Sequence, residues 1–270
     1  MLSVAFAAGA CIGSFLNVCI HRIPADESVV HPRSRCRSCG TFIAWHDNVP
    51  IFSWAWLRAS CRTCQAPISA RYPLVEAATG ALAVLALARF GPTPVAAVAF
   101  AFTAALLLIT FIDLDHRFIP DEVSLPGIVV GLAASFLPGW PVHPTDALFG
   151  VLLGGGILWA VAWGYERMTG VEGMGFGDVK LLAMIGAFLG WQAIPGVLVI
   201  ASIAGSIAGI AVMLSRGASH AGRRVVKRFG VGALPVFAQR AARRTAIPFG
   251  PFLALGAVLA LYHPELTQPW

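Results

Sequence analysis

Two aspartates, Asp113 and Asp178, stand at the ends of apolar segments, where a carboxylate is costly unless it has a function. Asp113 directly follows the apolar run from Val95 to Ile112, and Asp178 follows a glycine-rich stretch, 172–177. Carboxylates that are brought together cannot both ionise cheaply, so one of them keeps a proton. The protonated acid then polarises a peptide carbonyl, and the ionised acid activates water. The two acids therefore predict aspartic peptidase chemistry.

A third acid, Asp115, lies two residues after Asp113. Two positions correspond to about 200° around a helix, so only one of these acids can face Asp178. The glycines before Asp178 permit close approach of another segment, but the stretch lacks the lysine and hydroxyl residue of a phosphate-binding loop. Acids are also common at helix ends, because they stabilise a helix N-terminus. Two unrelated acids therefore stay open as the alternative interpretation.

Four cysteines form two C-x-x-C pairs, Cys36 with Cys39 and Cys61 with Cys64. The 21 residues between the pairs match the spacing of a zinc site. Four thiolates complete a tetrahedral shell and leave no open position, so such a site is structural rather than catalytic. A reduced set of cysteines without a metal is the alternative.

The segments that carry these residues indicate an all-α polytopic membrane protein. Of the 270 residues, 57% are hydrophobic and 12% are charged, about half the charged fraction of a soluble domain. The spans are expected to be helices, because the backbone groups of an open sheet would be unsatisfied in lipid. Eight apolar runs approach the length of about 20 residues that a crossing needs. They are 1–21, 74–90, 95–112, 124–138, 146–165, 179–190, 192–214 and 247–263.

The basic residues fall almost entirely on one side of this arrangement. With eight spans, all of the 19 lysines and arginines except Arg89 lie in loops that alternate to the same side. Loops rich in basic residues stay in the cytoplasm, so both termini are predicted to lie outside. The cytoplasmic loops are then 22–73, 113–123, 166–180 and 215–246. They contain the four paired cysteines, in a compartment that disfavours disulfides, and both candidate aspartates.

The net charge of +6 is explained by these loops and does not require nucleic acid as a partner. In the loop 215–246, hydrophobic residues are interspersed with arginine and lysine. A helix lying on anionic lipid headgroups is one interpretation, and a solvated basic loop is the other. The run 1–21 has no basic residue before Arg22, unlike a secretory signal peptide, and is expected to be a retained span.

Several motifs occur in a fixed order along the chain. The first half carries Gly13-Ser-Phe-Leu-Asn-Val18, the two C-x-x-C pairs and Arg71-Tyr-Pro-Leu-Val-Glu76. The second half carries Asp113-Leu-Asp-His, Gly173-Met-Gly-Phe-Gly-Asp178 and Pro248-Phe-Gly-Pro-Phe252. In these motifs the chain resembles the bacterial type IV prepilin peptidases over nearly its whole length.

This resemblance implies an aspartic peptidase that cuts the basic leader of type IV prepilins or type II secretion pseudopilins. It places the enzyme in the bacterial inner membrane, with cleavage at the cytoplasmic face. It further implies methylation of the new N-terminal residue from S-adenosylmethionine. The implied catalytic pair is Asp113 and Asp178. Asp113 is preferred to Asp115 because of its spacing from Pro120.

The resemblance also divides the chain into two parts. Residues 1–90 contain the first span, the loop that would hold a structural Zn²⁺ and the second span, and they are associated with methylation. Residues 91–270 form the membrane-embedded peptidase. The motifs do not mark the residues that bind the methyl donor.

Two other functions fit parts of the sequence. A peptidase without methyltransferase activity would normally lack the cysteine loop and the first-span motif. A proton- or ion-coupled transporter would carry its acids at the bilayer midplane, within broken helices. Here the acids stand at the ends of the apolar runs, which disfavours transport.

Overall fold

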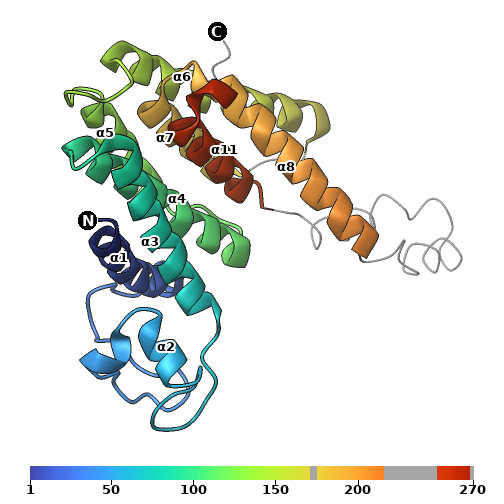
Figure 1. Cartoon of the computed structure of the whole chain (residues 1–270). Coiled ribbons are helices and arrows are strands. Elements are labelled where there is room, and N and C mark those ends of the chain that lie inside the picture. The colour runs from blue at the N-terminus through green and yellow to red at the C-terminus, as the bar shows by residue number, and fades with distance from the viewer. Residues whose placement is uncertain (171–174, 216–247, 268–270) are drawn as a thin grey trace, which may run out of the picture.

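The computed structural model describes residues 1–170, 175–215 and 248–267, and throughout these ranges the chain forms helices and short connections (Figure 1). Within the same ranges, β-pairing is limited to two isolated β-bridges in the cysteine loop. The α-helices are α1 (Leu2–Arg22), α2 (Phe52–Trp56), α3 (Arg71–Phe90), α4 (Pro94–His116), α5 (Asp121–Ala134), α6 (Pro144–Thr169), α7 (Phe176–Leu189), α8 (Ala193–Ser215) and α11 (Gly250–Tyr262). Short 3₁₀ turns are η1 (Ile23–Ala25), η2 (Trp45–Asn48) and η4 (Pro264–Leu266).

The prediction of an all-helical, multi-pass membrane protein is confirmed. Five helices are long and apolar enough to cross a membrane, and they are α1, α3, α4, α6 and α8. The remaining apolar runs also form helices, but α5, α7 and α11 have only 14, 14 and 13 residues. At a rise of about 1.5 Å per residue each is about 20 Å long, shorter than the hydrocarbon core. The count of eight spans therefore stays a prediction.

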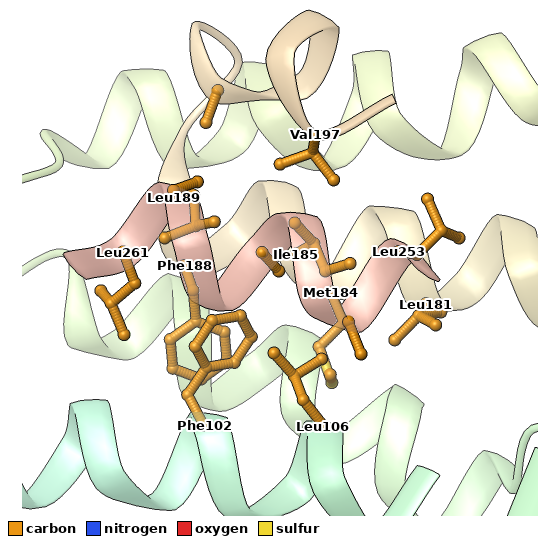
Figure 2. Packing of buried hydrophobic residues seen from close by; sticks show 14 of the residues in the cluster. Phe102, Leu106, Leu181, Met184, Ile185, Phe188, Leu189, Val197, Leu253 and Leu261 are labelled. Carbon is orange, nitrogen blue, oxygen red and sulfur yellow. The ribbon is translucent and has the colours of Figure 1, made fainter. Parts of the chain in front are cut away.

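Helix α7 lies at the centre of the larger core. Every residue from Leu181 to Leu189 is buried, as expected for a helix that is apolar on all sides. Figure 2 shows its side chains meeting those of α4, α8 and α11. Phe188 stacks on Phe102 of α4, with ring centroids 4.2 Å apart. This core fixes the first turn of α7, which carries Asp178.

Two glycines let α6 pack closely on α7. A Cβ atom on Gly150 would collide with the backbone oxygen of Gly186, and a Cβ atom on Gly186 would collide with that of Gly150. The two backbones therefore touch at this crossing, as small residues allow in membrane helices.

A second apolar cluster joins α1, α3 and α4, and its fully buried members include Val75 and Ile112. In Figure 1, α1 and α3 lie side by side, and the loop that contains α2 caps one end of both. This loop contains the four paired cysteines.

Helix α4 extends beyond the predicted end of its apolar run at Ile112 and reaches His116, so Asp113 and Asp115 both lie in its last turn. Two predicted features fall outside the described residues. One is the start of the glycine-rich stretch, at 171–174, and the other is nearly all of the basic loop, at 216–247.

Candidate active site and metal centre

Asp113 is buried in the last turn of α4, with 5% of its surface exposed. The backbone N–H of Gly250, at the start of α11, donates a hydrogen bond of 3.0 Å to Asp113 Oδ2. The first N–H groups of a helix have no partner within the helix, so a carboxylate placed there satisfies one of them. The N-terminus of α11 therefore fixes the carboxylate of Asp113.

Asp178 is half-buried in the first turn of α7, and its carboxylate interacts electrostatically with that of Asp113. Ile119, in the turn between α4 and α5, packs against Gly177, which precedes Asp178, and against Gly250, which contacts Asp113. A Cβ atom on Gly177 would lie 2.9 Å from Ile119 Cβ, and one on Gly250 would lie 3.4 Å from Ile119 Cδ1. The structure thus brings together the two predicted acids, which are far apart in the sequence.

An ion pair supports this arrangement from outside. Lys180 Nζ donates to both carboxylate oxygens of Asp121, each at 2.7 Å. Asp121 begins α5 and Lys180 lies in α7, two residues after Asp178. The pair therefore holds the α4–α5 turn against the first turn of α7.

Asp115 has a different environment from Asp113. Its carboxylate forms an ion pair with Arg71, at the start of α3, with 2.5 Å between Arg71 Nη1 and Asp115 Oδ2. The same guanidinium donates to the backbone oxygen of Phe111 at 3.1 Å and lies over its ring. Asp113 is buried and Asp115 is exposed, in agreement with the expectation that they face different directions.

The structure also gathers Cys36, Cys39, Cys61 and Cys64. Their sulfur atoms all lie within 4.8 Å of one another, and the Sγ atoms of Cys36 and Cys64 are 3.7 Å apart. A tetrahedral zinc site with Zn–S bonds of about 2.3 Å separates its sulfurs by about 3.8 Å. The four cysteines therefore fit a tetrahedral ion of this size.

Each C-x-x-C pair forms a turn with the same backbone pattern. In the first, the N–H of Cys36 donates to the oxygen of Thr41, and the N–H of Gly40 donates to the oxygen of Cys36, both at 2.9 Å. In the second, Cys61 bonds Ala66 and Gln65 bonds Cys61 in the same way, at 2.9 and 3.0 Å. The residue after each second cysteine has a positive φ, 72° for Gly40 and 56° for Gln65. Glycine adopts this conformation readily, whereas glutamine rarely does, so the sequence marks the first turn but not the second.

The thiols of this cluster do not ionise equally. Hydrogen bonding by the side chain and backbone of Thr41 lowers the pKa of Cys39 to about 6. At Cys64 the backbone N–H of Ala66 favours the thiolate, but desolvation and the neighbouring sulfurs outweigh it and raise the pKa to about 11. If all four cysteines ionise, the crowded thiolates repel one another, and a coordinated zinc ion would supply the compensating positive charge.

The cysteine loop is braced by side chains that the motifs did not reveal. Arg62 donates to both carboxylate oxygens of Asp47, at 2.7 and 2.6 Å, and lowers the pKa of that carboxyl. The indole N–H of Trp54 donates to the backbone oxygen of Ile68 at 3.0 Å. These contacts tie the second cysteine turn and the residues that follow it to η2 and α2.

Three features near the acids were also missed by sequence reasoning: the Gly250 donor, the Arg71–Asp115 pair and the Lys180–Asp121 pair. Gly250 belongs to the quoted motif Pro248-Phe-Gly-Pro-Phe252, which had no assigned role. The motif could therefore have directed attention to this glycine, although not to its partner.

Two family models match the chain. Residues 7–90 match the bacterial peptidase A24 N-terminal domain, and residues 100–210 match the type IV leader peptidase family. Curated relatives include proteins of Aeromonas hydrophila and Myxococcus xanthus, each 38% identical to this chain and each named prepilin leader peptidase/N-methyltransferase. The first alignment covers 99% of this chain and 92% of the Aeromonas protein, and the second covers 97% of this chain and 90% of the Myxococcus protein. No solved structure matches the chain.

Proposed function

The chain belongs to the type IV leader peptidase family, and we propose that it cleaves the leader of type IV prepilins or pseudopilins and methylates the new N-terminus. The observation that carries the peptidase assignment is the convergence of Asp113 and Asp178 at the ends of two helices that are remote in the sequence. The methyltransferase assignment rests on the names of relatives that are similar over almost the whole chain.

Asp113 and Asp178 are the proposed catalytic pair. Two nearby carboxylates share one proton, because both cannot be ionised cheaply in one place. The ionised acid takes a proton from water, whose oxygen attacks the scissile carbonyl, while the protonated acid gives its proton to the carbonyl oxygen. The C–N bond then breaks, the leaving amine receives a proton from the acid that first accepted one, and a hydroxyl of the intermediate returns its proton to the other acid. The Gly250 N–H holds the Asp113 carboxylate in a fixed orientation throughout.

Cys36, Cys39, Cys61 and Cys64 are proposed to hold a structural Zn²⁺, because their sulfur separations fit a closed tetrahedral shell. The ion would supply positive charge and a cross-link between the two cysteine turns, without an open position for catalysis. Residues 1–90, which include this loop, are proposed as the methyltransferase-associated region and 91–270 as the peptidase.

The proposed topology has eight spans, cytoplasmic loops at the acids and cysteines, and both termini outside the inner membrane. Contacts support one part of it. The ion pairs Arg71–Asp115 and Lys180–Asp121 and the bond from Gly250 to Asp113 join the ends of five helices. Those ends are the starts of α3, α5, α7 and α11 and the end of α4, which the alternation of eight spans puts on one side.

Among the alternatives, a transporter is disfavoured because both acids lie in terminal turns of their helices and not in broken helices at mid-depth. A peptidase without methylation is disfavoured because the cysteine loop and the first-span motif are both present.

The test is cleavage of a purified prepilin by the full-length protein, followed by mass spectrometry of both products. Asp113→Asn and Asp178→Asn should each abolish leader removal, while the control Asp115→Asn, which changes an acid in the same turn, should retain it. Methylation is measured separately on a pilin that has already been cleaved, and both aspartate variants should retain it. If Asp113→Asn and Asp178→Asn each leave cleavage intact, the catalytic pair is wrong.

A further inference from the structure

A large cavity lies between α1, α3 and the cysteine loop, apart from the two acids. Its volume is about 980 Å³, at the upper end of the range for ligand pockets. Ser14, Asn17 and His21 line it from α1, at a spacing that places them on one face of that helix. Tyr72 and Glu76 line it from the first turns of α3. Polar residues inside helices of membrane length are costly and generally mark a functional cavity.

Contacts between α1 and α3 hold this polar wall in place. The side-chain amide of Asn17 donates to the backbone oxygen of Tyr72 at 3.1 Å, and the Tyr72 hydroxyl lies 3.1 Å from His21 Nε2. A Cβ atom on Gly13 would lie 2.7 Å from the Cα atom of Glu76, so the helices touch at this glycine. The close approach places Glu76 directly beside α1.

Glu76 is 7% exposed and holds a strained turn of the cysteine loop. Its Oε2 accepts a hydrogen bond of 2.7 Å from the backbone N–H of Ile51. Ile51 has φ 63° and ψ −50°, and the N–H of Phe52 donates to the oxygen of Pro50 at 2.5 Å. This is the classic γ-turn, which is rare and especially unfavourable for a β-branched residue. Backbone strain of this kind clusters at ligand-binding and catalytic sites.

The chemistry of the walls suits a nucleoside that carries an amino acid, with an amine held beside it. Glu76 supplies a carboxylate at the helical wall, and Arg35 and Arg37 supply positive charge from the loop. Tyr72 and Trp54 provide aromatic rings suited to a base. S-Adenosylmethionine has a carboxylate, a cationic centre and an adenine ring.

We propose that this cavity binds S-adenosylmethionine together with the N-terminus of the cleaved pilin, and that Glu76 binds and orients the pilin α-amine for methylation. The inference rests on the proposed function and assigns the methyl-transfer site to one face of α1 and α3. The lone pair of the neutral α-amine attacks the methyl carbon, the C–S bond breaks with its electron pair going to sulfur, and the methylated amine loses a proton to water.

The cavity lies next to the proposed peptidase site. Arg71 lines the cavity and also forms the ion pair with Asp115, two residues beyond Asp113. The Arg71–Asp115 ion pair therefore lies between the proposed peptidase site and the cavity. This position explains how one membrane-bound product meets both reactions without leaving the protein.

The first experiment measures binding of S-adenosylhomocysteine, which cannot donate a methyl group, to the purified zinc-containing protein by equilibrium dialysis. Val18 lines the cavity, so the larger indole of Val18→Trp would project into it and should weaken binding by about tenfold or more. Phe15→Trp is the matched control, because Phe15 lies on the same helix but is 50% exposed on its outer side. Cleavage of a prepilin should persist in both variants.

Normal binding and methylation by Val18→Trp would overturn the assignment of the cavity. A direct measurement on the unaltered protein covers the case in which that variant does not fold. Ultraviolet irradiation with labelled S-adenosylmethionine should label peptides from 14–22, 34–69 or 71–76, which line the cavity, and labelling confined to other segments would exclude the site. A wild-type protein that neither cleaves nor methylates a prepilin would instead refute the proposed function.

Glu76→Gln tests the role of the carboxylate. The amide oxygen can still accept from Ile51, so the turn, zinc content and S-adenosylhomocysteine binding should be retained. Methylation should fall by about tenfold or more, the size expected for loss of a hydrogen bond to a charged group, with the effect largely in KM for the pilin. Unchanged methylation, or loss of zinc together with donor binding, would show that Glu76 only anchors the loop.

Discussion

Gly250→Ala tests whether the contact between α11 and α4 positions a catalytic acid. A Cβ atom at this position would lie 2.5 Å from Asp113 Oδ2 and 3.3 Å from its Cγ. Non-bonded atoms are most stable about 3.5 Å apart, so the carboxylate would have to move by about 1 Å. A displacement of about 1 Å in a catalytic group costs about 100-fold in rate. We therefore expect a loss of that order in prepilin cleavage.

The assay is single-turnover cleavage by the purified full-length variant, with methylation of a pre-cleaved pilin measured in parallel. Methylation should be unchanged, since Gly250 does not line the cavity between α1 and α3. Gly156→Ala is the control, because a Cβ atom there would meet no described atom within 4 Å. Normal cleavage by Gly250→Ala would refute the reasoning and would separate Asp113 from the chemistry.

The remaining predictions concern the cysteine loop. The purified protein should contain about one zinc ion per chain, and Cys36→Ser should lower this content and impair methylation, as metal analysis and the methylation assay would show. Gly40→Ala should cost about 1–2 kcal/mol because of the positive φ, which weakens zinc binding about 5- to 30-fold in a chelator competition. Gln65→Gly should instead strengthen zinc binding, because glycine tolerates the positive φ at this position. Equal zinc affinities in the two variants would contradict the proposed twin turns. Asp47→Asn should lower the loop's stability by less than about 1 kcal/mol, measured by thermal melting with zinc present, because its partner Arg62 is 54% exposed.

Sequence reasoning succeeded where the signal is local or cumulative. The spacing of Cys36, Cys39, Cys61 and Cys64 predicted a cluster that the structure assembles, since two residues between cysteines allow both sulfurs to point into one turn. It failed at Gln65, because glycine usually marks a position of positive φ in a sequence and this position carries glutamine.

Local sequence signals also do not determine how a helix is buried or which distant side chains pair. The apolar runs around α5, α7 and α11 were identified, but periodicity does not say that α7 is enclosed by protein on all sides. The pairing of Asp115 with Arg71 could not be read either, because the two residues are 44 positions apart and neither requires the other locally.

By itself, the sequence determined the helical membrane class, the cysteine cluster and the two candidate acids, because hydropathy, spacing and charge are properties of the chain alone. Only the tertiary structure decided which atoms meet at the acids. The Gly250 N–H that fixes Asp113 and the Ile119 side chain between Gly177 and Gly250 come from separate segments. The cavity beside Glu76 likewise exists only where α1, α3 and the loop converge. Such contacts depend on how helices pack, and packing is settled by the whole core rather than by any one stretch of sequence.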